Sequence, residues 1–407
     1  MFESALITKA EAGTEIDLGL IAETVFFYRS THLLLNIGSL ESLAKSLSPD
    51  DLLAFFDRTG IKLTYLRPNY AVVSGGAPRT AQFVAVTFGG RAERKVKNHK
   101  EEIAFRLERA LGSSRATAKL VKQINDRVSL HKFTESNKED VVPQLSRQDA
   151  ADKSFIREGV KSIINHLVPE YQIPSHFRFD LIDTGQGYAV DTDIDYTAIN
   201  ARYHQSVSPA HSTISSDYIL AHFIGARADS YFAATYMSEI VTSALNSALI
   251  RLKHFDFLHR RGLNEEQLQL FLDTIVGDVP RLSEAINSRD RTISDFLRLL
   301  DQADKFRSWL GNINPNEGLL RSYMRAATEQ TWADKIPTKS VRFAISTGLG
   351  MLADAMFPTG IGTAAGLSVG AADSLYIDRI IKGWRPNQFI EGAYAPFVSG
   401  NSKRRAD

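Results

Sequence analysis

Cysteine is absent from the 407-residue chain, which excludes disulfide scaffolds and metal or redox sites built from thiolates. An excess of charge of either sign is also lacking, because 48 lysine and arginine residues are balanced by 47 aspartate and glutamate residues. This balance argues against a dedicated nucleic-acid or acidic-lipid binder. The first residues lack a basic start followed by a long apolar run, so the sequence predicts an intracellular, cytoplasmic protein.

Several catalytic motifs are missing as well. The sequence contains no HExxH zinc motif and no Walker-type phosphate loop. Residues 366–370 match the G-x-S-x-G nucleophile elbow, but hydrolases with this elbow carry a histidine downstream, and the last histidine here is His259. Residues 360–365 match a dinucleotide-binding loop, yet too little chain follows them for the parallel sheet of that fold. We therefore assign no catalytic or cofactor-binding residues, and the sequence favours a non-enzymatic protein.

Residues 1–133 mix helical and strand patterns and are predicted to form a mixed α/β domain. Ser48 and Pro49 are typical of a helix start, and the acidic residues after them suit the positive end of that helix. Strand-like segments follow at residues 61–66, 70–74 and 81–88. These segments predict a short antiparallel sheet.

The end of this domain is basic. Residues 91–132 contain 12 lysine and arginine residues against 5 aspartate and glutamate residues, on two predicted amphipathic helices. We interpret this basic patch as a solvated helix face. Contact with nucleic acid is the alternative, and it is not favoured, because Phe105 and Phe133 alone offer aromatic surfaces for stacking nearby.

The rest of the chain is predicted to be a linker and a helical body, which makes the fold class α+β. Residues 134–152 are polar and contain a proline, as a linker would. Residues 153–407 are predicted to be mainly helical, because apolar residues recur at helical spacing from Met237 to Leu252. One β-hairpin is predicted within residues 177–199, around a Gly-Gln-Gly turn.

The predicted β-hairpin carries a group of carboxylates. Side chains alternate along a strand, so these acids would share one face, with one contribution from the partner strand. The residues are Asp180, Asp191, Asp193 and Asp195. Carboxylates of this kind can bind Mg²⁺ or Mn²⁺, which would suit a phosphoesterase or nuclease. A solvated polar face of an ordinary hairpin is the simpler interpretation.

A glycine pattern distinguishes the C-terminal part. From Phe343 to Ala372 the single charged residue is Asp354. Gly362, Gly366 and Gly370 recur every four residues, which would line one helix face with hydrogen atoms and let a second helix approach closely. Residues 343–382 are therefore predicted to form a glycine-zipper helical hairpin.

The flanks of this hairpin resemble those of membrane segments. Arg342 precedes it, Lys382 ends it and Trp384 follows, as expected if both ends stay on the cytoplasmic side. The first arm offers only about 14 apolar residues, roughly 21 Å of helix, against a bilayer core of about 30 Å. The hairpin is therefore expected to pack within soluble protein, or to insert only when self-association supplies the packing.

These features lead to one principal functional hypothesis and two alternatives. The principal one is a non-enzymatic effector or interaction protein whose C-terminal hairpin mediates self-assembly or conditional membrane insertion. Self-association is expected, the inner face of a membrane is a candidate partner, and no cofactor is expected. The alternatives are a Mg²⁺- or Mn²⁺-dependent phosphoesterase or nuclease that uses the aspartate group, and a soluble regulatory adaptor.

Overall fold

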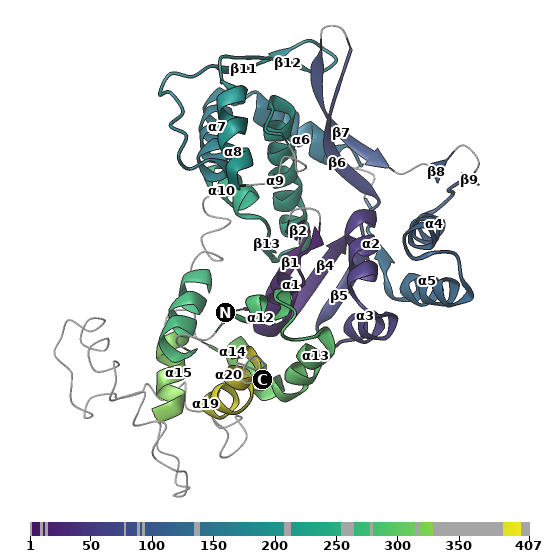
Figure 1. Ribbon diagram of the computed structural model, residues 1–407, viewed down its shortest axis with the longest axis vertical. Helices are drawn as coiled ribbons and strands as arrows, with labels where there is room; N and C mark the ends of the chain where they lie inside the picture. The colour runs from purple at the N-terminus through teal and green to yellow at the C-terminus, as the bar shows by residue number, and fades with distance from the viewer. Residues whose placement is uncertain are drawn as a thin grey trace, which may run out of the picture. The chain divides into compact units, whose positions relative to one another are not determined.

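The computed structural model shows two compact units (Figure 1). It describes residues 2–8, 11–12, 15–76, 79–87, 90–91, 94–133, 139–206, 213–253, 264–276, 280–313, 318–328 and 386–399. Unit 1 consists of residues 1–3, 26–29 and 263–407, and unit 2 of residues 4–25 and 30–262. Unit 2 contains two main sheets with helices around them, and the described part of unit 1 is helical, so the α+β fold class is confirmed.

A five-stranded parallel sheet forms the centre of unit 2. Its strands are β1 (Ser4–Ile7), β4 (Ser30–Leu35), β5 (Ile61–Tyr65), β10 (Ser129–Leu130) and β13 (Glu239–Val241). Their spatial order is β10-β5-β4-β1-β13, and every neighbouring pair is parallel. Leu33 and Leu34 point to opposite faces and are both buried, because helices cover both sides of such a sheet.

A four-stranded antiparallel sheet is the second sheet of unit 2. It has the order β11-β12-β7-β6, with β6 at Pro68–Gly75, β7 at Thr80–Thr87, β11 at Phe179–Asp183 and β12 at Tyr188–Thr192. The predicted β-hairpin is confirmed as β11 and β12, and Gly185 in its turn has a φ of 77° that suits glycine. Tyr188 pairs with Ala81, so this hairpin extends the sheet that β6 and β7 begin.

Two predictions about local structure are wrong. The segment at residues 61–66 joins the parallel sheet and not an antiparallel meander. Thr64 of this strand is buried, and its hydroxyl lies 2.8 Å from Nε2 of His32. Residues Met237 to Leu252 do not form one continuous helix, because β13 lies within them and α10 begins only at Ala244. Val241 of this buried strand has the spacing that a helix would also show.

Ten helices of unit 2 have defined bounds. They are α1 (Leu18–Phe27, which continues into unit 1), α2 (Ile37–Ser46), α3 (Pro49–Phe56), α4 (His99–Leu111), α5 (Arg115–Arg127), α6 (Val141–Ala150), α7 (Lys153–Leu167), α8 (Tyr196–Ser206), α9 (Ser216–Tyr236) and α10 (Ala244–Lys253). The predicted start of α3 is confirmed, because the hydroxyl of Ser48 accepts a hydrogen bond from the backbone of Asp51 at 3.1 Å. The predicted linker region contains α6, which packs against α9 and β7.

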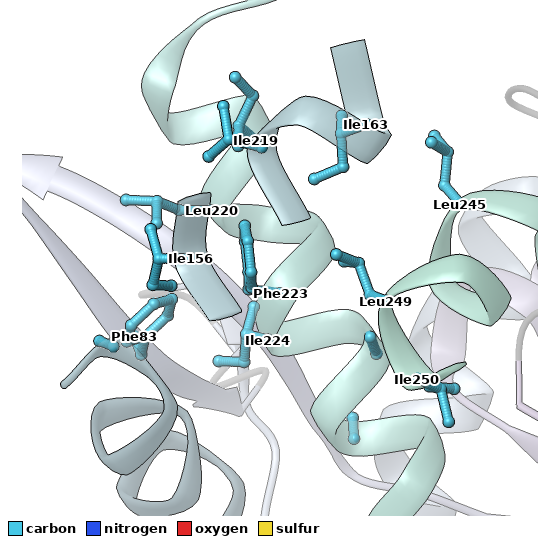
Figure 2. Close-up of a cluster of buried hydrophobic side chains, with 14 of the residues drawn as sticks. Phe83, Ile156, Ile163, Ile219, Leu220, Phe223, Ile224, Leu245, Leu249 and Ile250 are labelled. Carbon is cyan, nitrogen blue, oxygen red and sulfur yellow. The ribbon is translucent and has the colours of Figure 1, made fainter. Parts of the chain in front are cut away.

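The main core of unit 2 is aliphatic. Figure 2 shows Ile156 of α7, Phe223 of α9 and Leu249 of α10 converging between the three helices. Gly159 allows α7 to approach its neighbours closely, because a Cβ atom at this position would lie 2.5 Å from Cζ of Phe223. Two small two-stranded ribbons complete the strands: β2 (Glu11–Ala12) with β3 (Glu15–Ile16), and β8 (Gly90–Arg91) with β9 (Arg94–Lys95).

The described part of unit 1 consists of short helices. They are η1 (Leu272–Val276), α12 (Leu282–Asn287), α13 (Ile293–Gln302), α14 (Asp304–Gly311), α15 (Leu319–Thr328), α19 (Pro386–Phe389), η3 (Ile390–Tyr394) and α20 (Ala395–Val398). Across the portion of the chain that the structure describes, no helix is both long enough and apolar enough to cross a bilayer.

Candidate functional site

The four aspartates of the predicted metal site occupy three different settings. Asp180 and Asp191 lie directly opposite each other on β11 and β12. The carboxylate of Asp191 forms an exposed ion pair with Arg178, at 3.2 Å from Nε. Asp193 and Asp195 follow the end of β12 and do not continue its alternation.

Asp193 and Asp195 have local structural partners. The carboxylate of Asp193 accepts a hydrogen bond from the backbone of Arg178 at 2.7 Å. Asp195 accepts one from the backbone of Ala198 at 2.9 Å, at the start of α8. Among the described residues, no group of three or more histidine or acidic side chains is placed to hold a metal ion. The described geometry therefore gives no support to a Mg²⁺ or Mn²⁺ site here.

The predicted glycine hairpin lies outside the described residues. This applies to every residue assigned to it, namely Gly362, Gly366, Gly370, Arg342, Lys382 and Trp384. The helices on either side are described, because α15 ends at Thr328 and α19 begins at Pro386.

Helices α15 and α19, which flank residues 329–385, contact each other. Aromatic side chains pack around this junction. The ring of Phe389 on α19 stacks on Phe306 of α14, with ring centroids 5.1 Å apart and an interplanar angle of 25°. Tyr323 of α15 packs edge-on against Trp309, which also lies on α14, with ring centroids 6.1 Å apart. Helix α14 thus bridges the helix before the segment and the helix after it.

Further rings enlarge this cluster, which we call the aromatic base. Its members are Phe26, Phe271, Phe306, Trp309, Tyr323, Phe389 and Tyr394. All of them are buried, and each buried aromatic side chain removes about 150–250 Å² from water. Burial, together with the negative charge of Glu391, raises the pKa of Tyr323 above its ordinary value, so its hydroxyl stays neutral.

Arginine side chains fasten the C-terminal helices to the same unit. The guanidinium of Arg291 donates hydrogen bonds to the backbone oxygens of Phe397 at 2.7 Å and Pro396 at 3.1 Å. Arg307 of α14 donates to the backbone oxygen of Tyr28 at 3.0 Å. The described residues of the aromatic base are held by ring contacts and buried surface.

Unit 2 contains a buried polar cluster that no spacing in the sequence indicates. Asp229 of α9 is 2% exposed, and its carboxylate accepts hydrogen bonds from the hydroxyl of Thr8, from that of Thr242 at 2.5 Å and from the amide of Asn246 at 2.8 Å. Thr8 and Thr242 follow β1 and β13, where strand connections diverge and α/β folds commonly bind ligands. Each hydrogen bond here is internal, so the cluster joins α9 and α10 to the sheet.

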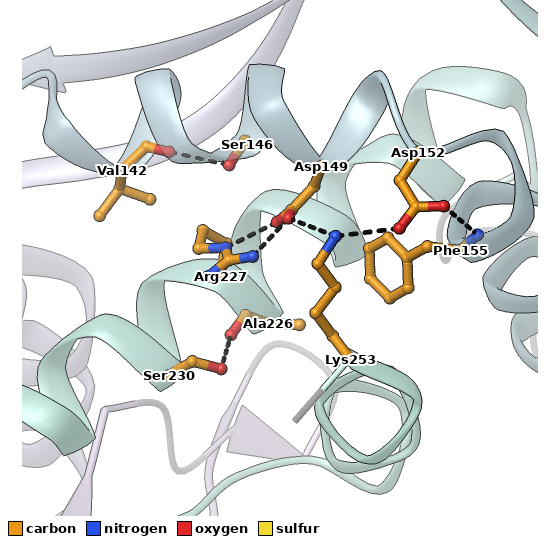
Figure 3. Close-up of polar contacts among 9 residues, drawn as sticks. All are labelled: Val142, Ser146, Asp149, Asp152, Phe155, Ala226, Arg227, Ser230 and Lys253. Atoms are coloured by element: carbon orange, nitrogen blue, oxygen red, sulfur yellow. Dashed lines mark hydrogen bonds and ion pairs between the residues drawn. The ribbon is translucent and has the colours of Figure 1, made fainter. Parts of the chain in front are cut away.

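An ion-pair network elsewhere in unit 2 is also structural. The guanidinium of Arg227 on α9 makes two hydrogen bonds to Asp149 of α6, and its Nε lies 2.6 Å from Oδ2 (Figure 3). Nζ of Lys253 lies 3.1 Å from the same carboxylate and 3.3 Å from that of Asp152. All the charges are compensated, and the network connects α6, α9 and α10.

Two histidines lie against α9 near β4 and β10. The ring of His32 packs edge-on against Tyr236, and Nδ1 of His131 lies 2.6 Å from the hydroxyl of Tyr236. Burial is the largest cause that lowers the pKa of His32 to about 4, and the charges of Lys62 and His131 add to it. Burial also lowers the pKa of His131. Both rings are therefore neutral at neutral pH.

Comparisons with known proteins add no function. The chain matches no protein-family description, no curated protein and no solved structure.

Proposed function

We propose that this chain is a non-enzymatic effector or interaction protein whose C-terminal glycine-zipper hairpin mediates self-assembly or conditional membrane insertion. One observation supports the proposal: helices α15 and α19, which flank residues 329–385, contact each other and both pack against α14 in the aromatic base. A chain that connects two contacting helices has to turn back on itself. Two antiparallel arms joined by the bend at residues 358–360 satisfy this requirement.

The sequence of the segment supports the same proposal. Its small residues permit close helix contact, and the cations Arg342 and Lys382 flank the two arms in the sequence. Both ends then stay on one side of a membrane, as a hairpin requires. The arms contain mostly small side chains, which contribute little transfer free energy, so contacts between copies supply the remaining stabilisation.

The first experiment measures dye release from vesicles of mixed neutral and anionic lipid. The full-length chain is compared with a variant in which a short Gly-Ser linker replaces residues 343–382, so that α15 and α19 are both retained. We expect leakage with the full-length chain alone, accompanied by self-association in analytical ultracentrifugation. Equal behaviour of the two proteins in both assays would overturn the proposal.

A pair of substitutions tests the glycine pattern itself. Gly366→Leu places a large side chain on the glycine face, and we expect it to abolish leakage and self-association. Ala365→Leu adds the same side chain one position away, off the repeated glycine face, and we expect it to retain most activity. Circular dichroism has to show that both variants are folded. Equal activity of the two would exclude the zipper.

A further inference from the structure

Helices α4 and α5 form an antiparallel helical hairpin in unit 2. Gly112, with a φ of 85°, ends α4, and Ser114 caps α5 by accepting a hydrogen bond from the backbone of Thr117 at 3.0 Å. At the far end of the hairpin, the side-chain amide of Asn125 donates to the backbone oxygen of Lys100 at 3.3 Å. The two helices therefore run side by side along their whole length.

The two faces of α5 differ sharply. Leu120, Val121 and Ile124 are buried. Arg115, Lys119 and Lys122 are exposed and follow one another at helical spacing along the opposite face, and the exposed Asp126 follows at the C-terminal end of the same row. Among the described residues none of these three cations has a carboxylate partner, whereas Arg127 at the end of the helix pairs with Asp57 at 2.7 Å.

The exposed charge around this face is strongly positive. Within residues 97–127, all of which are described, the exposed cations are Lys97, Lys100, Arg109, Arg115, Lys119 and Lys122, and the exposed anion is Asp126. Glu102 is fully buried, where it accepts a hydrogen bond from the hydroxyl of Tyr65 at 2.9 Å. Glu101 is half-buried and accepts one from the backbone of Lys97 at 2.9 Å. The near-neutral charge of the whole chain thus conceals a local cationic surface.

The side chains on this face indicate which kind of polyanion it would bind. Between the cations, α5 exposes Ala116 and Ala118, and no large apolar or aromatic side chain of α5 is exposed. A helix that lies in a membrane interface needs an exposed apolar face, and a platform for single-stranded nucleic acid needs aromatic rings. Contact with the phosphate backbone of a duplex requires neither feature, because lysine and arginine side chains supply it.

We infer that the exposed face of α5, with Arg115, Lys119 and Lys122, binds the phosphate backbone of double-stranded nucleic acid. From Arg115 to Lys122 the helix rises by about 10 Å. A DNA duplex carries about one charge per 3.4 Å on each strand, so this length corresponds to roughly three phosphates of one strand. Binding of this kind is independent of base sequence, because no groove contact is involved. The inference does not depend on the proposed function of the glycine-rich segment.

The test measures fluorescence anisotropy of a labelled DNA duplex with the full-length protein over a range of salt concentrations. The variant carries Arg115→Gln, Lys119→Gln and Lys122→Gln, which keep helix propensity and remove three charges. Three phosphate contacts predict that the slope of log K against log salt becomes shallower by about 2.7, and that affinity at about 50 mM salt falls at least about tenfold.

A matched control removes three exposed cations from other helices of the same unit. Lys153, Lys161 and Arg251 are exposed, and their replacement by Gln changes the net charge by the same amount. We expect this control to bind almost like wild type. If both variants lose affinity equally, or if neither does, the α5 surface is not the binding site. Binding to anionic vesicles that exceeds binding to the duplex, and that the α5 substitutions abolish, would also overturn the inference in favour of a lipid surface.

Discussion

The two compact units are stabilised by different kinds of core. Unit 2 packs mainly isoleucine, leucine and valine between long helices and a buried sheet, with Phe223 among them (Figure 2). The described part of unit 1 relies on the aromatic base, where Phe306 contacts Trp309 of its own helix and rings from two other segments, Phe26 and Phe389. Aliphatic packing permits close approach of long helices, whereas large rings can join short helices that bury little surface individually. The described short helices of unit 1 therefore depend on ring packing for their mutual contacts.

The largest expected effect is the loss of stability when one buried ring is truncated in either core. Phe306 is fully buried, and Phe306→Ala is expected to destabilise unit 1 by about 3–5 kcal/mol. Phe223→Ala in unit 2 should cost a similar amount. Hydrogen exchange measured by mass spectrometry resolves the two units. We expect each variant to lose protection mainly in its own unit, and a uniform loss in both units would contradict the independence of the two cores.

Acid is expected to act on unit 2 through His32. The unfolded imidazole has its ordinary pKa of 6.5, whereas the folded pKa is about 4, so between these values the unfolded state binds more protons. Stability is therefore lost as the pH falls from 6.5 towards 4, by about 3 kcal/mol from this residue. Urea unfolding at several pH values measures the slope. His32→Gln should flatten it, while His166→Gln, at an exposed position, should leave it unchanged.

Local signals in the sequence predicted local structure well. Ser48 identified the start of α3, and the glycines of the turn identified the β11–β12 hairpin. The parallel sheet was missed because its strands come from residues 4 to 241, and pairing between distant strands leaves no periodic signal. The cap at Ser48 depends on a residue within one helical turn, so the local sequence reveals it. Thr8 and Asp229 of the buried polar cluster are separated by 221 positions, and no local pattern connects them.

The candidate sites show the same division between local and distant information. Alternation predicted that Asp180 and Asp191 would be neighbours, which the register confirms. It could not show that Asp193 and Asp195 lie beyond the strand, where Asp193 accepts a hydrogen bond from the backbone of Arg178 and Asp195 accepts one at the start of α8. The aromatic base joins residues from 26 to 394, so a single sequence contains no spacing that reveals it. The glycine hairpin itself stays a prediction.

A smaller effect tests the close helix contacts of unit 2. A Cβ atom at Gly159 would lie 2.5 Å from Cζ of Phe223 and 2.9 Å from Cδ2 of Leu249. Gly159→Ala is therefore expected to destabilise unit 2 by about 1–3 kcal/mol through overpacking, despite the better helix propensity of alanine. Gly75→Ala is the control, because no atom lies within 4 Å of its added Cβ. Urea midpoints that shift equally would show that α7 adjusts without cost.

The smallest expected effect is a gain in stability at the end of α9. Met237 is 90% exposed and adopts a left-handed conformation, with φ of 48° and ψ of 43°. Its side chain contributes little burial, while its Cβ atom makes this conformation unfavourable by about 1–2 kcal/mol. Met237→Gly should therefore stabilise unit 2 by about 0.5–1 kcal/mol, after allowance for the greater freedom of glycine in the unfolded chain. Met237→Ala retains the Cβ atom and should give no such gain. If the urea midpoint rises equally in both variants, loss of the exposed methionine side chain, and not relief of backbone strain, is the cause.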